Sequence, residues 1–207
     1  MQGLIATPAA PSVEAYLASL PRGLASYPEC VFKGDSLDAW LRQTPTHDVA
    51  HLVSPQLAAL LDRDRPIGTW VPEVQVNALY LAIRDAHFAD DAAYLAHAGE
   101  SNRAVLDTPF NRVVFWAASP RAILRSAGLR WGSLHRGSSI EVRSARDSSV
   151  EIVLSFPRGL FPEIVLRANA LGMAVALENT GARDVEVHLR AVEPTRALFA
   201  ARWRSGT

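Results

Sequence analysis

Two histidines four residues apart are the first feature of this sequence with a spacing suited to chemistry. His47 and His51 flank Asp48, and on a helix they would share one face, as the ligands of zinc hydrolases do. Prolines on both sides leave little room for a helix, Asp48 is one methylene shorter than the usual glutamate base, and no third ligand is obvious. A polar turn is therefore the favoured interpretation, and metal binding stays open as an alternative.

Two further histidines lie on segments with strong helical periodicity. His87 continues an apolar stripe that includes Tyr80, and His97 follows Tyr94 by three residues, so each pair shares a helix face. A helical histidine can ligate haem iron, but a hydrogen-bonded histidine beside the core is the simpler interpretation. Trp116 ends an apolar run that these helices must cover. We predict that five residues lie close together, either as filled core, which we favour, or as the lining of an apolar ligand pocket: Tyr80, His87, Tyr94, His97 and Trp116.

The sequence lacks the common signatures of catalysis. It has no Gly-x-Ser-x-Gly nucleophile elbow, no phosphate-binding glycine loop and no Gly-x-Gly-x-x-Gly after a strand. Glu141, Glu151 and Glu186 occupy the polar positions of alternating segments, where a solvated sheet face explains them better than acid–base pairing does. We therefore expect a protein that is not an enzyme.

The composition is that of a chain that buries a core and has no overall electrostatic field. Of the 207 residues, 49% are hydrophobic and 20% are charged, which excludes wholesale disorder. The 21 basic and 21 acidic residues cancel, so we expect no nucleic-acid partner, although Arg121, Arg125 and Arg130 form a basic segment. Near-zero net charge also permits self-association, which leaves a homodimer open.

Cysteine usage and apolar run lengths bear on the compartment. Cys30 is the only cysteine, which excludes an internal disulfide and a cysteine-rich zinc site and suits a reducing compartment. Residues 1–12 lack the basic segment and the apolar run of a signal peptide, and no stretch of 18 apolar residues could span a membrane. We expect a cytoplasmic protein without a membrane partner.

The period of the apolar residues changes once along the chain. Before residue 138 it is helical, with the strongest helix beginning at Pro72, and the first 68 residues show only helix and turn. Beyond residue 138, apolar and polar residues alternate over 140–154 and 185–189, on either side of a helix over 162–179 that Gly181 closes. With a last apolar strand over 198–203, the C-terminal third is predicted to run strand, strand, helix, strand, strand.

Neither part can bury its apolar surface alone, which favours one domain over residues 1–207. We predict an α+β fold in which a helical N-terminal half packs on a small antiparallel sheet, with residues 1–12 as a loose lead-in. Short helices should begin after Ser12, Asp35 and Ser54. A helical run over 113–117 and a capped segment after Ser119, which carries Ile123, Leu124 and Leu129, should complete the helical half.

The order of these elements resembles that of a known ligand-sensing superfamily. The residues that carry the resemblance are Phe115-Trp116, the run from Ser119 to Leu124, Trp131, Gly172, the run from Ala176 to Gly181, and Trp203. Over residues 70 to 204 the chain is similar to haem-NO-binding-like and 4-vinyl-reductase-like domains, especially bacterial members that have no assigned activity.

The resemblance implies an apolar pocket between helices and sheet that holds haem or a small aromatic molecule, in a domain that signals and does not catalyse. Haem-binding members carry a Tyr-x-Ser-x-Arg motif, and zinc-stabilised aromatic sensors carry cysteines near the C-terminal strand; this sequence has neither. We therefore expect no cofactor. The leading hypothesis is a non-enzymatic, cytoplasmic signalling or small-molecule-sensing module with a small apolar ligand.

Two other classes of protein stay open. A protein–protein interaction or scaffolding module is suggested by tryptophans beside arginines, as at Trp131 and Trp203, because such residues are enriched in interfaces. A haem- or metal-dependent protein would use the His47/His51 pair or His97.

Overall fold

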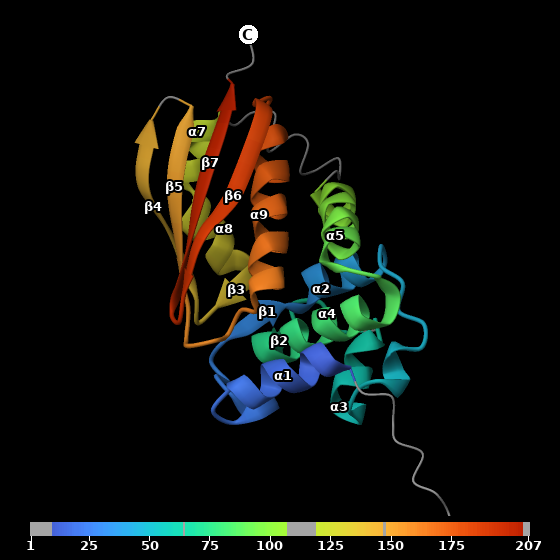
Figure 1. Cartoon of the computed structure of the whole chain (residues 1–207). Helices are drawn as coiled ribbons and strands as arrows, with labels where there is room; N and C mark the ends of the chain where they lie inside the picture. The colour runs from blue at the N-terminus through green and yellow to red at the C-terminus, as the bar shows by residue number, and fades with distance from the viewer. Residues whose placement is uncertain (1–9, 64, 107–118, 147, 205–207) are drawn as a thin grey trace, which may run out of the picture.

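A helical layer and two antiparallel sheets make up the part of the chain that the computed structural model describes, residues 10–63, 65–106, 119–146 and 148–204 (Figure 1). The N-terminal elements are α1 (Pro11–Ser19), β1 (Val31–Lys33), α2 (Gly34–Leu41), α3 (Pro55–Ala58), β2 (Trp70–Pro72), α4 (Glu73–His87) and α5 (Asp91–Leu106). Short 3-10 turns lie at Gly23–Ala25, Val49–His51 and Ala59–Leu61. The C-terminal elements are α7 (Pro120–Arg125), α8 (Ala127–Leu134), β3 (His135–Arg136), β4 (Ser139–Arg146), β5 (Ser149–Ser155), α9 (Glu163–Glu178), β6 (Arg183–Glu193) and β7 (Arg196–Arg204).

The larger sheet has the strand order β4-β5-β7-β6, and every neighbouring pair is antiparallel. Phe199 on β7 lies opposite Ile152 on one side and Leu189 on the other, so apolar side chains of three strands meet on one face. Pro162 precedes α9, and Gly181 follows it with a positive φ of 83°. The predicted α+β fold and the order strand, strand, helix, strand, strand are confirmed.

Helices cover the inner face of this sheet unevenly. On the central strands, Leu154 and Phe199 are fully buried, whereas Ile140 on β4 and Val187 and Leu189 on β6 are only half-buried. The covering helices are α9 on the β6 side and the α7–α8 pair on the β4 side (Figure 1). A helix with its side chains is about 10–12 Å wide, but the outer strands of four lie about 14 Å apart. The coverage therefore thins at both edge strands.

The helical layer and the sheet share one apolar core. Val74, Leu79 and Ile83 of α4 are fully buried and belong to the same cluster of buried residues as Leu154 and Phe199. Hydrogen bonds also cross between the two layers.

The carbonyl of Leu160, in the loop before α9, is the acceptor for these crossing bonds. The Tyr16 hydroxyl on α1 donates to it at 2.6 Å, and Asn77 Nδ2 on α4 donates to it at 2.8 Å. Because all three residues are buried, these bonds fix α1 and α4 against the loop that starts α9.

A second sheet lies where the helical layer meets the larger sheet (Figure 1). Its order is β2-β1-β3, and Phe32 of β1 lies opposite Val71 on one side and His135 on the other. The expectation that the first 68 residues hold only helix and turn is therefore wrong. Strands of two or three residues are too short to show an alternating pattern, so no periodic signal predicts them.

A buried hydrogen bond holds the smaller sheet against α4. Glu73, the first residue of α4, places its Oε2 atom 3.0 Å from Nδ1 of His135 on β3, and both side chains are less than a tenth exposed. The His135 ring stacks on Trp131 with a centroid distance of 3.7 Å and an interplanar angle of 5°. A buried polar group needs its hydrogen-bond partner, so these contacts make β3 a specific link between the two layers.

The N-terminal boundary differs from the sequence prediction. The first helix begins at Pro11, and Ala10 before it is only 2% exposed, so the lead-in ends before residue 10. Ser12 does not cap this helix: its backbone N–H and hydroxyl donate to Asp85 on α4, each at 2.8 Å. Residues 1–9 lie outside the described part of the chain.

The expected caps before α3 and α7 are confirmed, because Ser54 and Ser119 accept backbone N–H groups of their first turns. The segment after Ser119 is two helices and not one, however, since α7 ends at Arg125 and α8 begins at Ala127. Leu129 on α8 is 82% exposed and does not join the core. The run over 113–117 lies outside the described residues, and among the described helices none is long and apolar enough to cross a bilayer.

Truncation of a fully buried aromatic residue tests this core. Phe199→Ala should lower the free energy of unfolding by about 3–5 kcal/mol, because it leaves a cavity between α9 and the central strands. The matched control is Leu129→Ala at an exposed position, which should change stability by less than about 0.5 kcal/mol. Urea denaturation followed by circular dichroism measures both, and equal effects at the two positions would contradict the packing described.

Candidate functional site

Three of the residues predicted from sequence lie together between α2, α4 and α5. Tyr80, Tyr94 and His97 surround Trp40 and Phe88, and we refer to these five residues as the aromatic cluster. Ring centroids are 4.5 Å apart for Trp40 and Tyr80, 5.5 Å for Phe88 and Tyr94, and 5.1 Å for Phe88 and His97. At these distances the rings are in contact and leave no space for another molecule between them.

One imidazole nitrogen of the cluster is hydrogen-bonded within the helical layer. Nε2 of His97 lies 3.1 Å from the Thr44 hydroxyl and 3.2 Å from the Ser101 hydroxyl. Burial lowers the pKa of His97, so its ring is neutral at physiological pH. Burial also raises the pKa values of Tyr80 and Tyr94 well above the ordinary value for a phenol. The cluster is therefore uncharged, and its rings fill the space between α2, α4 and α5.

His87 and the His47–His51 pair form a separate group. The His87 ring lies 4.3 Å from that of His47, and burial, followed by the charge of His47, lowers the pKa of His87. Nε2 of His87 is buried and has no hydrogen-bond partner within the described structure. Asp48 has a left-handed φ of 63° and begins a 3-10 turn, so His51 does not share a helix face with His47.

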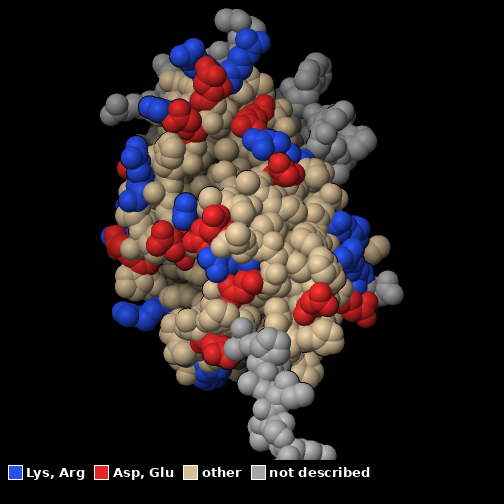
Figure 2. All heavy atoms as spheres, turned by 45° about the vertical axis from the view of Figure 1, so that its right-hand side comes forward, with Lys and Arg blue, Asp and Glu red and all other residues tan. Residues whose placement is uncertain are grey.

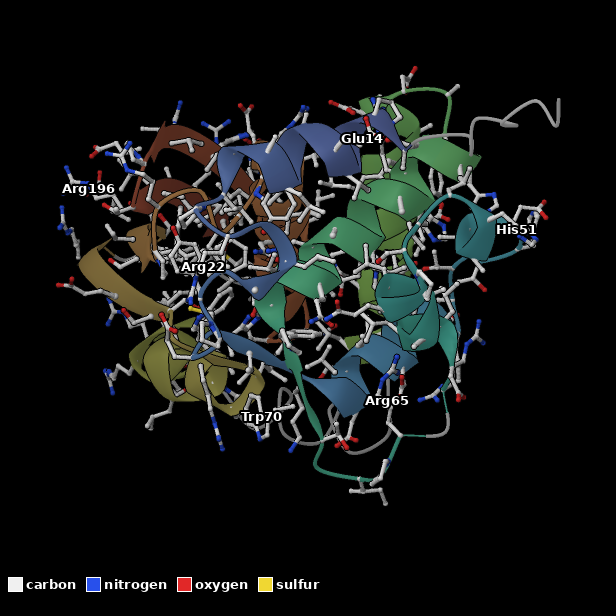
Figure 3. All side chains as sticks on the ribbon, turned by 90° about the horizontal axis from the view of Figure 1, so that it is seen from below. Glu14, Arg22, His51, Arg65, Trp70 and Arg196 are labelled. Carbon is white, nitrogen blue, oxygen red and sulfur yellow. The ribbon has the colours of Figure 1, made fainter. Side chains whose placement is uncertain are left out.

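Figure 3 shows His51 at the outer rim of the helical layer, where it is exposed to solvent. The pair therefore lies in a turn and lacks the geometry of a zinc hydrolase. Over the described ranges, no three His, Cys, Asp or Glu residues are placed to hold a metal ion. Trp116 lies outside the described residues.

A cavity of about 310 Å³ lies between helices and sheet, but its lining differs from the predicted one. It is enclosed by α5, α9 and β6, and we refer to it as the edge cavity. The lining residues are Leu95, Glu163, Arg167, Ala170, Leu171, Val187, His188 and Leu189. Five of these eight are apolar, and the charged ones come from the first two turns of α9.

The close crossing of α5 and α9 forms one wall of the edge cavity. A Cβ added at Gly99 of α5 would lie 3.7 Å from Leu171 Cδ1, and one added at Gly172 of α9 would lie 3.4 Å from Asn102 Nδ2. Both distances are ordinary van der Waals contacts, so α5 and α9 are packed against each other at these positions. On the side of α9 that faces β6, Val187 and Leu189 are only half-buried, and the helices leave an unfilled space beside them.

Two opposite charges in the edge cavity remain unpaired. Glu163 and Arg167 are one helical turn apart, yet neither has an ion pair or a side-chain hydrogen bond within the described part of the chain. His188, in contrast, lies 3.1 Å from Glu186, which also accepts a hydrogen bond from Arg202. These two hydrogen bonds lower the pKa of Glu186. Acidic and basic side chains alternate over this side of the molecule, so no large patch of one charge surrounds the cavity (Figure 2).

The sequence did not reveal the edge cavity, although it predicted the elements that form it. Val187 and Leu189 were recognised as inward-facing strand residues, and Leu171 as the apolar face of a helix. Whether such residues touch one another or leave a gap depends on the crossing of α5 and α9, which no local pattern encodes. Nor could the sequence predict that Arg167 makes no ion pair within the described residues, because a glutamate four residues before it predicts a pair.

Comparison with known proteins relates the fold to one group of structures. No protein-family model matches the sequence, and no curated protein matches it either. The structure is similar to that of an oxygen-binding H-NOX domain related to soluble guanylate cyclases, in its oxygen complex, with a TM-score of 0.56, 10% identity, and coverage of 84% of this chain and 96% of the other. A mutant H-NOX domain from T. tengcongensis gives a TM-score of 0.55 at 10% identity, with 84% and 99% covered. The chain therefore has an H-NOX-like fold.

Haem is the group that this fold implies, and the residues present do not fit it. His97, on helix α5, forms hydrogen bonds through Nε2 with Thr44 and Ser101, and the rings of Trp40 and Phe88 occupy the space beside it. The edge cavity is at the lower limit of small-molecule pockets, which span about 300–1,000 Å³. The one histidine that lines it, His188, is exposed and bonded to Glu186. The described residues therefore do not support a haem-based function for this chain.

Histidine protonation should weaken the fold in acid. The pKa values of His97 and His87 are lowered in the folded state, so the unfolded chain binds protons that the folded chain does not. The free energy of unfolding should fall as pH drops below about 6.5, the unperturbed histidine pKa, until the folded-state pKa values are reached. His97→Gln should reduce this slope by at most about 1.4 kcal/mol per pH unit. Urea denaturation from pH 5 to 8 measures it, and His51→Gln at an exposed position is the control; equal slopes in all three proteins would contradict the burial of His97.

Added haem should not be ligated by His97. Because Nε2 of His97 is already hydrogen-bonded behind aromatic rings, the absorption spectrum of a haem titration should be the same for the natural protein and for His97→Ala. A sharp Soret band in the natural protein that disappears in His97→Ala, and persists in His188→Ala, would contradict the fit described here.

Proposed function

We propose that this protein is a non-enzymatic, small-molecule-sensing module whose ligand binds in the edge cavity. The observation that carries the proposal is the cavity itself: a concave, largely apolar site with a few charged groups, enclosed by two helices and a strand. The H-NOX-like fold supports a sensing role, since one structure with this fold is an oxygen complex. The expectations of a bacterial source and a cytoplasmic location stay predictions from the sequence.

The position of the cavity suits a sensor because its walls are anchored differently. Leu95 belongs to α5, and its neighbour Tyr94 is buried in the aromatic cluster of the helical layer. Val187 and Leu189 belong to an edge strand of the larger sheet. A ligand that touches both walls favours the arrangement in which they are correctly spaced, and this difference in affinity shifts the population of α5 positions. The aromatic cluster then transmits the ligand signal, while Tyr80, Tyr94 and His97 do not contact the ligand.

The scaffolding alternative loses much of its basis in the structure. Trp203 is only 4% exposed and belongs to the core, and Trp131 stacks on the buried ring of His135. Both tryptophans beside arginines are therefore packing residues.

Filling the edge cavity should abolish ligand binding and leave the fold intact. Val187→Trp places a large side chain in the cavity from a strand position that favours aromatic residues. In a thermal-shift screen of small apolar molecules, a ligand of the natural protein present at a hundredfold excess over its Kd adds about 2.7 kcal/mol of stability. This gain should vanish in Val187→Trp. It should persist in Val192→Trp, which alters an exposed position of the same strand outside the cavity.

The far-UV circular dichroism spectra of both variants should match that of the natural protein, which separates loss of the site from loss of the fold. A ligand whose stabilising effect is unchanged by Val187→Trp binds elsewhere, and that result would overturn the proposal.

A further inference from the structure

The size of the edge cavity limits its ligand. One water molecule takes up about 30 Å³ of liquid, so a cavity of about 310 Å³ replaces roughly ten waters. A molecule with about ten non-hydrogen atoms fills this space. Five apolar side chains line it, so the body of the ligand is hydrocarbon: Leu95, Ala170, Leu171, Val187 and Leu189.

Arg167 supplies the polar contact. Its guanidinium has no ion pair or hydrogen bond within the described structure, although Glu163 lies one turn before it on α9. A guanidinium at the rim of an apolar cavity can lay its aliphatic stem along the wall and hold a carboxylate through two parallel hydrogen bonds. No other basic side chain lines the cavity except His188, which is bonded to Glu186.

Glu163 needs no ligand to explain its position. It is the first residue of α9, where a carboxylate interacts favourably with the positive end of the helix dipole. Its negative charge lies close to that of any bound carboxylate, and this disfavours a ligand with a second acidic group. Glu163 and Arg167 are both exposed members of the lining, so the guanidinium is open to one carboxylate, and the nearby negative charge of Glu163 disfavours a second.

The edge of β6 adds further donors. Val187, His188 and Leu189 are consecutive and all line the cavity, although neighbouring side chains of a strand point to opposite faces. The cavity must therefore run along the edge of the strand as well as its inner face. In the described sheet β6 pairs only with β7, so backbone N–H groups on its outer side are open to a ligand.

We infer that the edge cavity binds a small apolar monocarboxylate of about ten non-hydrogen atoms, with its hydrocarbon between α9 and β6 and its carboxylate on Arg167. The inference rests on the proposed function and specifies the ligand of that site.

Calorimetric titration with octanoate and its uncharged counterpart octanamide, below the concentrations at which octanoate forms micelles, tests the inference. Octanoate should bind the natural protein at least tenfold more tightly than octanamide does. Arg167→Gln should weaken octanoate binding at least tenfold and leave octanamide unchanged. The matched control is Arg190→Gln on β6, outside the cavity lining, which should alter octanoate binding less than twofold.

Four results would overturn the inference, and they differ in what they say about the proposed function. Equal binding of the two compounds, abolished by Val187→Trp, removes the role of Arg167 and keeps the edge cavity as a ligand site. Binding of 2-aminooctanoate in place of octanoate shows that Glu163 pairs with an ammonium group and that the ligand is zwitterionic. If none of the three compounds binds, the carboxylate inference fails. If binding is insensitive to Val187→Trp, the carboxylate inference fails and the ligand also lies outside the cavity.

Discussion

A helix with its side chains is about 10–12 Å across, whereas the outer strands of a four-stranded sheet lie about 14 Å apart. One helix therefore cannot cover the inner face of the larger sheet. The α7–α8 pair covers the β4 side, α9 covers the β6 side, and the fully buried Leu154 and Phe199 lie on the central strands, where the coverage is complete. Among the described helices, α5 lies beyond α9 and contributes Leu95 to the space beside β6. The edge cavity is the space that this arrangement leaves.

Two histidines, His97 and His135, are in contrast already hydrogen-bonded within the protein. His97 bonds to Thr44 and Ser101, and His135 bonds to Glu73 and stacks on Trp131. These bonds engage Nε2 of His97 and Nδ1 of His135, so neither nitrogen is free to ligate a metal or haem iron. The chain thus shares an H-NOX-like fold but uses its buried histidines for structure, which moves the candidate ligand site from the aromatic cluster to the edge of the sheet.

Periodic elements could be predicted from the sequence, and contacts between elements could not. The alternation around Ile152 and Val187 and the helical repeat of Val76, Leu79 and Ile83 are local signals, and the structure confirms the strands and helices they predict. Strands β1, β2 and β3 have at most three residues each and depend on pairing between distant segments, so no local pattern announces them.

The candidate site shows the same division. The spacing predicts that Tyr94 and His97 share a helix face, and both contact Phe88, whereas Tyr80 contacts Trp40 and its predicted neighbour His87 contacts His47. Whether these faces enclose a ligand or one another is decided by Trp40 and Phe88, which pack between them. The edge cavity depends on a helix crossing, on incomplete coverage and on a charge pair that does not form. All three are properties of the tertiary structure.

A crystal structure with 8-bromooctanoate tests the central claim most directly, because anomalous scattering from bromine locates the ligand without assumptions. The account predicts a bromine peak in the edge cavity, between Leu171 and Leu189, with the carboxylate on Arg167 and the aromatic cluster unchanged. A bromine peak among Trp40, Tyr80 and Tyr94, with the rings moved apart, would contradict it and restore the aromatic cluster as the ligand site.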